Sequence, residues 1–263
     1  MQSDFLGRIL ESKKEEVEAA RREIPEARLQ EASRKPRARR PFLDRLSVPG
    51  AHGANIVAEI KRGSPSKGLI KRDLDPVSYA RSYESGGAAA LSVLTDRDFF
   101  MGGPEDLERA RSAVSLPVLR KDFIISTYQI HQAVVWGADA VLLIVRALPG
   151  ELLHECLALC GGLQIDALVE VHSDSELESA TRAGARLIGI NNRDLSSFKT
   201  DIETSIRLSR HLQPDQIAVS ESGIRSREDI ERLLSAGIWN FLIGESLVRA
   251  RDPGDLLRKL LGG

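Results

Sequence analysis

Eight short apolar runs, rich in β-branched residues, alternate with amphipathic segments after residue 54 of the sequence. Runs of this kind are typical of buried strands, and apolar residues spaced three or four apart are typical of helices that cover a sheet. Gly137, Gly184 and Gly237 follow amphipathic segments, at the point where helices commonly end. We therefore predict strands at residues 55–59, 89–95, 117–121, 139–145, 165–171, 187–191, 216–220 and 239–243.

The number of these strand-helix units favours a closed parallel barrel. Eight units fit within 263 residues, and the Gly-x-Gly-x-x-Gly turn that would favour an open doubly wound sheet does not follow the first run. The sequence predicts an α/β fold, a (β/α)8 TIM barrel, in a single domain of residues 1–263. Phe5, Ile9 and Val17 recur at helical spacing, so residues 1–50 are expected to form an N-terminal helical extension packed on the barrel.

Composition and charge exclude several classes of protein. With 42% hydrophobic and 29% charged residues, the chain can bury a large core and is not a disordered protein. A formal net charge of -1 and a pI near 6.6 give no field that would hold nucleic acid or an anionic membrane. No stretch reaches the roughly 20 apolar residues of a membrane helix, and the acid-rich start does not resemble a secretory signal. We expect a cytoplasmic monomer without nucleic-acid or membrane partners.

Two features admit both a structural and a functional interpretation. Cys156 and Cys160 share one face of a predicted helix, but the surrounding leucines provide no further metal ligands, so we favour core packing. Residues 34–40 hold five basic residues of seven and could contact nucleic acid. Because the acidic residues of 11–31 nearly cancel this charge, we favour a solvated linker. His172 lies near the predicted site, where we expect a hydrogen-bonded supporting role.

Charged side chains end several predicted strands, at the edge where barrel enzymes carry catalytic groups. Glu59 and Lys61 are two residues apart, so strand alternation points both into the barrel mouth. They could form a structural ion pair, but buried pairs seldom improve stability, and we favour a proton-transfer pair that also meets an anionic substrate. Lys121 ends the third strand. We expect its neighbours to lower its pKa toward neutrality, so that it can act as a general acid.

Further polar groups end the third, fifth and sixth strands. Glu170 is a carboxylate in an otherwise apolar strand and is the natural general base. Asn191 can orient a carboxylate or a hydroxyl, and Arg193 can bind a carboxylate through two parallel hydrogen bonds. Arg120 and Asp122 alternate outward, where we expect them to hold the ring of helices.

The last two units suggest a phosphate site. Gly223 and Gly244 each follow a strand directly, and backbone N–H groups after the seventh and eighth strands bind phosphate in many barrels. Helix capping would explain either glycine alone, but the two together favour phosphate binding. We expect Glu245 to offer its backbone N–H while its side chain points to solvent. Residues 96–103 and 68–73 have the composition of mobile lids, although ordinary surface loops look similar.

Six segments in order resemble the motifs of indole-3-glycerol phosphate synthases, enzymes of tryptophan biosynthesis, and the resemblance covers nearly the whole chain. The segments are Glu59-Ile60-Lys61-Arg62-Gly63-Ser64-Pro65-Ser66, Leu119-Arg120-Lys121-Asp122-Phe123, Val169-Glu170-Val171-His172, Ile190-Asn191-Asn192-Arg193-Asp194-Leu195, Ser220-Glu221-Ser222-Gly223-Ile224 and Ile243-Gly244-Glu245-Ser246-Leu247.

The resemblance implies a carboxy-lyase that cyclises carboxyphenylamino-deoxyribulose phosphate to indole-3-glycerol phosphate, with loss of CO2 and water. It implies that Lys121 is the general acid at the ketone, that Glu170 assists, and that Glu59 with Lys61 handles the dehydration. Which lysine acts at which step stays open, because both face one mouth. Asn191 is implied as a further catalytic residue, which positions the substrate together with Arg193. The substrate-binding residues implied are Arg193, Phe123 beside the anthranilate ring, and a phosphate shell of Ser64, Ser222, Gly223, Gly244 and Glu245, to which we add Glu221 as substrate-binding.

The implied chemistry explains why we expect neither a cofactor nor a metal. Attack of the aromatic carbon on a protonated ketone creates a cationic iminium beside the substrate carboxylate, so the substrate supplies its own electron sink. The expected partner is a small sugar-phosphate substrate. Two alternatives remain: a barrel isomerase acting on a phosphoribosyl amine, which should lack the Glu59–Lys61 pair, and a non-catalytic phosphometabolite sensor in which Lys121 and Glu170 only bind.

Overall fold

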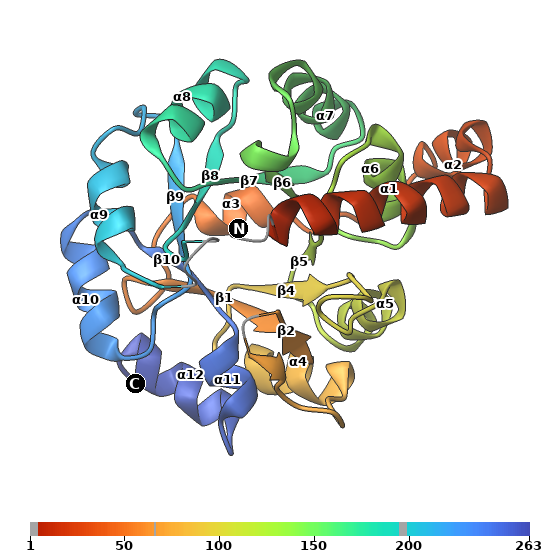
Figure 1. Cartoon of the computed structure of the whole chain (residues 1–263). Coiled ribbons are helices and arrows are strands. Elements are labelled where there is room, and N and C mark those ends of the chain that lie inside the picture. Colours follow the sequence, from red (N-terminus) through yellow and green to blue (C-terminus); the bar gives the residue numbers. More distant parts are fainter. Residues whose placement is uncertain (1–4, 66, 195–198) are drawn as a thin grey trace.

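The computed structural model describes residues 5–65, 67–194 and 199–263, which form a closed barrel of parallel strands inside a ring of helices (Figure 1). Around the barrel, the described strands follow the order β1-β4-β5-β6-β7-β8-β9-β10 and close on β1. This confirms the predicted (β/α)8 barrel. The strands are β1 (Asn55–Ile60), β4 (Ala90–Leu94), β5 (Val118–Lys121), β6 (Ala140–Ile144), β7 (Asp166–Val171), β8 (Leu187–Asn191), β9 (Ile217–Glu221) and β10 (Asn240–Ile243).

The surrounding helices begin and end at the residues that local chemistry favours. The Asp75 carboxylate accepts the backbone N–H of Ser78, and Ser226 and Asp229 form a reciprocal capping box. Gly137 and Gly237 adopt the left-handed conformation just beyond their helices. The helices are α4 (Pro76–Ser85), α5 (Pro104–Ala113), α6 (Thr127–Val135), α7 (Gly150–Gly162), α8 (Asp174–Arg182), α9 (Glu203–Ser209), α10 (Arg227–Ser235), α11 (Glu245–Arg249) and α12 (Pro253–Leu261), with a 3-10 turn at Val145–Ala147. Within the described residues, no helix is long and apolar enough to span a membrane.

Strand alternation divides the core into two parts. Outward-facing residues pack under the helices, whereas inward-facing residues such as Val57 and Leu119 fill the barrel together with Phe42 and Leu46. Phe42 and Leu46 belong to the short helix α3 (Phe42–Leu46), whose carbonyl at Leu46 accepts hydrogen bonds from residues at the start of β10. Helix α3 therefore closes the amino-terminal end of the barrel and leaves the other end for the polar strand ends.

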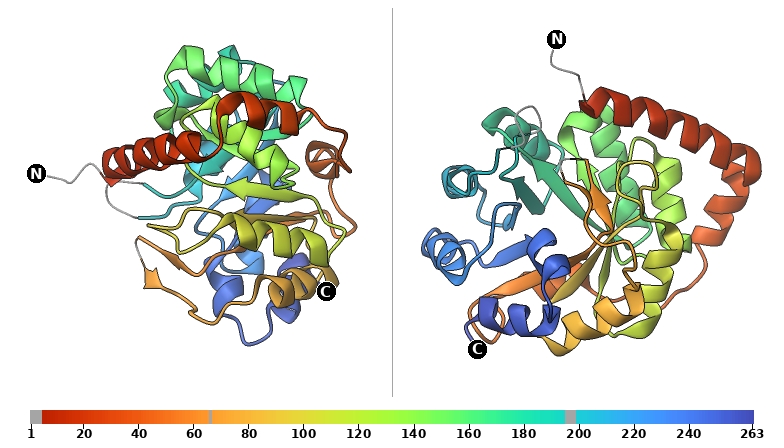
Figure 2. Two further views of the ribbon diagram at one scale, coloured as in Figure 1. Left: turned by 90° about the vertical axis from the view of Figure 1, so that its right-hand side faces the viewer. Right: turned by 60° about the horizontal axis from the view of Figure 1, so that its bottom comes forward.

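The rest of the extension packs against the barrel as expected, with α1 (Phe5–Glu23) crossing the carboxyl end and α2 (Glu26–Ser33) packing on α6. Figure 2 shows α1 and α3 at opposite ends of the barrel. One residue of α1 was not foreseen: the Lys13 ammonium is fully buried and forms ion pairs with Asp96 (2.9 Å), Asp122 (3.0 Å) and Glu16 (2.6 Å). Helix α1 is thus held to the barrel by a buried charge as well as by apolar contacts.

The basic segment 34–40 is a linker, as predicted, and most of it is exposed to solvent, whereas Arg37 and Arg40 are half-buried. Arg37 donates to the carbonyls of Ala138 and Gln164, and Arg40 donates to those of Arg111 and Leu116. These hydrogen bonds fix the segment to the amino-terminal end of the barrel, because strand starts expose carbonyls there that need donors.

A small antiparallel hairpin after β1 was also not predicted. It consists of β2 (Gly63–Ser64) and β3 (Gly68–Leu69), and the Arg62 carbonyl accepts the backbone N–H groups of Ile70 and Lys71. The two-residue strands are too short to give an alternation pattern in the sequence. The hairpin places Ser64 above the end of β1.

Candidate active site

A cavity of about 530 Å³ opens at the carboxyl end of the barrel. The structure brings together every side chain or glycine that the sequence predicted for the site; these are Glu59, Lys61, Ser64, Lys121, Phe123, Glu170, Asn191, Arg193, Glu221, Ser222, Gly223, Gly244 and Glu245. Ser66 and Leu195, which belong to two of the quoted motifs, lie outside the described residues. The cavity is the natural place for a small substrate, since ligands of such barrels bind at this end.

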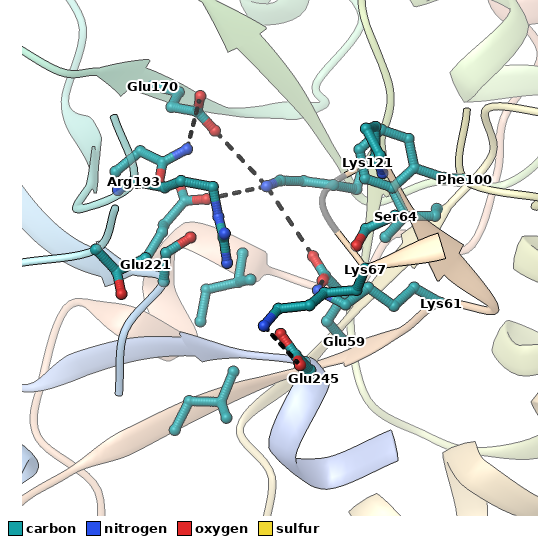
Figure 3. A pocket seen from close by; sticks show the side chains of 18 of the residues that line it. Glu59, Lys61, Ser64, Lys67, Phe100, Lys121, Glu170, Arg193, Glu221 and Glu245 are labelled. Carbon is teal, nitrogen blue, oxygen red and sulfur yellow. Dashed lines mark hydrogen bonds and ion pairs between the residues drawn. The ribbon is translucent and has the colours of Figure 1, made fainter. Parts of the chain in front are cut away.

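Lys121 lies at the centre of the site, with its ammonium among three carboxylates (Figure 3). Its Nζ is 2.9 Å from Glu221 Oε2, 3.6 Å from Glu170 Oε2 and 4.0 Å from Glu59 Oε2. The four side chains come from β1, β5, β7 and β9, each from an inward-facing strand position. A proton can pass between these groups because all the distances are at contact or one-water range.

The prediction that neighbours lower the pKa of Lys121 was wrong in sign. Burial alone would lower it, but the negative charges of Glu221, Glu170 and Glu59 outweigh burial and raise it above the ordinary lysine value. The sequence shows which residue ends each strand, but it does not show that three carboxylates from different strands meet at Lys121. Burial raises the pKa of Glu221 to about 7, although its contact with Lys121 opposes the shift. Lys121 therefore holds its proton at neutral pH.

Glu59 and Lys61 form the second charged pair, with 2.7 Å between Lys61 Nζ and Glu59 Oε1. Ser92 Oγ also donates to the Glu59 carboxylate, at 3.4 Å. Burial alone would raise the pKa of Glu59, but Lys61 and Lys121 lower it, so this carboxylate stays ionised. Both side chains line the cavity, and Lys61 is the more exposed of the two, which suits it to meet a substrate anion.

Glu170 is held by its neighbours on the adjoining strand. Asn191 Nδ2 donates to Glu170 Oε1 at 3.2 Å, and the Arg193 backbone N–H donates to Asn191 Oδ1 at 3.0 Å. His172 Nε2 lies 3.5 Å from Glu170, and His172 Nδ1 lies 3.2 Å from Glu176. Burial would lower the pKa of His172, but Glu176 and Glu170 raise it. His172 is therefore hydrogen-bonded to Glu176, whereas its Nε2, which faces Glu170, is buried without a hydrogen-bond partner among the described residues.

The opposite wall offers hydrogen-bond donors. Ser222 and Gly223 both adopt the left-handed conformation, with φ of 68° and 82°, which turns successive backbone N–H groups toward one side. Ser246 Oγ is buried without a hydrogen-bond partner among the described residues, and it lines the cavity. The Glu245 side chain was expected to point to solvent, which is wrong in part. It is partly exposed, but its carboxylate forms ion pairs with Lys67 (3.8 Å) and Arg249 (3.2 Å).

The third wall is apolar and contains residues that sequence reasoning missed. Phe123 and Phe100 have ring centroids 6.0 Å apart, and Phe5, Leu6 and Ile9 of α1 line the same wall. The helical spacing of the α1 residues predicted packing on the barrel but could not show that they face the cavity. Other lining residues that were not predicted are Lys67, Leu94, Leu142, Ile144, Arg225 and Arg249.

The loop 96–103, predicted as a lid, is tied to α1. Asp96 Oδ1 accepts the backbone N–H groups of Phe99 (2.7 Å) and Phe100 (3.1 Å), and the Phe99 ring meets the Phe5 ring edge to face at 5.8 Å. That this loop moves as a lid stays a prediction.

The remaining sequence features are structural. Cys156 and Cys160 are buried in the core, and burial raises the pKa of both thiols. Arg120 points outward and donates to the Gln129 carbonyl of α6 at 2.7 Å, which confirms its expected role in holding the helices. Across the described part of the chain, no group of three or more His, Cys, Asp or Glu side chains is arranged to hold a metal ion.

Comparison with known proteins identifies the family. The family model for indole-3-glycerol phosphate synthase matches residues 6–260. The chain belongs to this family. It is 61% identical to the indole-3-glycerol phosphate synthase of Syntrophobacter fumaroxidans over 99% of this chain and 98% of the relative. It is 54% identical to that of Desulfosudis oleivorans, over 98% and 99%. These findings confirm the predicted function, a carboxy-lyase that forms indole-3-glycerol phosphate in tryptophan biosynthesis.

Solved structures with little sequence similarity share the fold. Thiamine phosphate pyrophosphorylase from Pyrococcus furiosus matches with a TM-score of 0.59 and 15% identity, over 79% of this chain and 93% of that one. KGPDC from Streptococcus mutans matches with a TM-score of 0.61 and 13% identity, over 79% and 95%. At such low identity these likenesses show the barrel alone.

Proposed function

We propose that Lys121 is the general acid of ring closure and that the three carboxylates around it hold it at the substrate ketone. Ring closure joins the aromatic carbon that bears the carboxylate to the ketone carbon, while the ketone oxygen takes a proton. The single observation that carries this role is the position of the Lys121 ammonium, within 4.0 Å of Glu59, Glu170 and Glu221 at the floor of the cavity. A positioned acid of this kind contributes about 10²–10⁴ in rate.

Loss of CO2 follows ring closure, since the electrons of the breaking carbon–carbon bond return to the ring and neutralise the iminium. Water leaves next: the hydroxyl formed from the ketone departs with a second proton, and the neighbouring CH2 group gives up a proton to a base. We assign the second proton to Lys61 and the base to Glu59 or Glu170, because Lys61 and Glu59 are 2.7 Å apart beside the same floor. Asn191 holds Glu170 in place for either role.

The substrate phosphate is proposed to bind opposite the apolar wall. The left-handed pair Ser222–Gly223, the unpartnered Ser246 hydroxyl and the Gly244 backbone support this position. Lys61 and Lys67 also line the cavity and supply positive charge. With the phosphate there, the anthranilate ring lies toward Phe123 and Phe100, which places the ketone over Lys121.

We also propose that the protein is a single-domain monomer that works in the cytoplasm. All of the residues that we propose for catalysis and binding come from this chain, and its own helix α1 lines the cavity. Light scattering after size exclusion should give a mass near 28.9 kDa. A mass of twice this value would contradict the monomer.

Two measurements test the proposed function. Incubation of the protein with carboxyphenylamino-deoxyribulose phosphate should produce indole fluorescence, whereas a sensor would bind this compound without turnover. The same compound without its phosphate should lose about 10²–10⁴ in kcat/KM, because two or more charge-assisted hydrogen bonds of about 1.5–3 kcal/mol each are lost. Equal kcat/KM for both compounds would contradict the phosphate site.

A further inference from the structure

Gly189 lies in the interior of β8, where a glycine needs an explanation. Glycine weakens strands because it has no side chain to pack and loses more conformational freedom on folding than other residues. Its backbone does not adopt the left-handed conformation that favours glycine, so the local geometry would accept another residue. The space above its Cα is filled mainly by another side chain: a Cβ at this position would lie 2.2 Å from Glu221 Oε1, with Leu168 Cδ1 next at 3.3 Å.

We propose that Gly189 is a positioning residue, whose missing side chain provides the space in which the Glu221 carboxyl binds Lys121. The inference rests on the proposed roles of Glu221 and Lys121. Gly189 itself is not among the described residues that line the cavity, whereas Glu221 and Lys121 are. Its effect on the reaction must therefore pass through Glu221.

The contacts of Glu221 leave it little freedom elsewhere. Its Oε2 accepts the 2.9 Å hydrogen bond from Lys121, and its Oε1 is buried over Gly189 without a hydrogen-bond partner among the described residues. A methyl group on residue 189 would force this carboxyl to retreat by about 1 Å to reach an ordinary contact distance. Because the displaced atom ends a flexible side chain, the carboxyl moves and the backbone stays. Lys121 then loses its closest partner and keeps Glu170 at 3.6 Å and Glu59 at 4.0 Å.

The same arrangement occurs on the next two strands of the barrel, β10 and β1. A Cβ on Gly244 would lie 2.5 Å from Glu59 Oε1 and 3.0 Å from Lys61 Nζ. Two of the three carboxylates around Lys121 thus occupy space that a glycine leaves open. Gly244 is less suited to a test, because we also place it in the phosphate site.

A double-mutant cycle tests the inference with Gly189→Ala, Glu221→Ala and the variant that carries both. Gly189→Ala should lower kcat by about 10²-fold, as expected for a misplacement of about 1 Å, with KM changed less than about threefold. In the Glu221→Ala background the methyl group meets only the flexible end of Leu168, at 3.3 Å, so the same substitution should change kcat by less than about threefold. Gly161→Ala, on α7 where nothing lies within 4 Å of the added Cβ, is the control and should leave kcat unchanged.

The outcomes separate the inference from the function on which it rests. Wild-type kcat in Gly189→Ala, an equal loss in both backgrounds, or a lower thermal midpoint that accounts for the loss would each overturn the inference alone. Wild-type kcat in Glu221→Ala would overturn both the inference and the proposed role of Glu221.

Discussion

Replacement of Lys13 by methionine tests whether the buried charge under α1 stabilises the barrel. The Lys13 ammonium is fully buried, with Asp96 at 2.9 Å and Asp122 at 3.0 Å, and both carboxylates are buried as well. Methionine keeps most of the side-chain volume but leaves two buried carboxylates without this cation. Breaking a buried ion pair in this way costs about 3–5 kcal/mol. For a chain of this size, 1 kcal/mol lowers the thermal midpoint by about 2 °C, so we expect a fall of about 6–10 °C.

The pH dependence of this loss follows from the pKa values of the pair. Burial would raise the pKa of Asp122, but Arg120 and Lys13 hold it well below the ordinary 3.8. Its contribution to stability is therefore present above pH 4 and is lost as the pH falls further. The pKa of Lys13 is raised above 10.5, so its contribution is present at all lower pH values and is lost only above 10.5. The difference in thermal midpoint between wild type and Lys13→Met should be constant from pH 5 to 9 and should become smaller below pH 4.

Calorimetry or circular dichroism at several pH values measures the midpoints. Lys14→Met is the matched control, because Lys14 is the next residue of α1 and forms an exposed pair with Glu11. This control should shift the midpoint by less than about 1 °C. A shift in Lys13→Met no larger than that in the control would refute the reasoning.

Two further outcomes are expected. Phe123→Ala should raise KM about 10–100-fold with a smaller effect on kcat, because about 1.5–3 kcal/mol of apolar contact with the anthranilate ring is lost; an unchanged KM would exclude Phe123 from the ring site. Glu176→Gln should lower the pKa of His172, as followed by NMR, because Glu176 accounts for much of the rise. The raised pKa of His172 stabilises the fold below pH 6.5 and its contribution is lost as the pH rises through that pKa. Glu176→Gln should thus destabilise the protein more at pH 5.5 than at pH 9, and an equal loss at both would contradict this assignment.

The sequence predicted the barrel and the inward direction of its polar strand ends because both follow from local periodicity. Glu59, Lys121 and Glu170 each occupy an alternating position of a short apolar strand, and parallel strands bring their carboxyl ends together. The pKa of Lys121 could not be predicted in the same way. It depends on three carboxylates from distant strands, and the burial that opposes them is not visible in the residue pattern.

The other features that the sequence did not predict depend on contacts between residues far apart in the chain. In the sequence, Lys13 is one of many charged residues on an amphipathic helix. It is buried only because α1 packs over Asp96 and Asp122. The basic pattern of 34–40 predicts solvated side chains, and for the same reason it could not show that Arg37 and Arg40 bind backbone carbonyls of the barrel and its helices. Gly189 gave no signal, since its role depends on a carboxyl group from the neighbouring strand.

The assignment of Lys121 to ring closure is best tested by the release of CO2 in a single turnover. Lys121→Met should slow CO2 release by about 10²–10⁴, because no acid then meets the ketone. Lys61→Met should release CO2 at nearly the wild-type rate and accumulate the hydroxylated intermediate before water is lost. Release of CO2 at the wild-type rate in Lys121→Met would contradict the assignment.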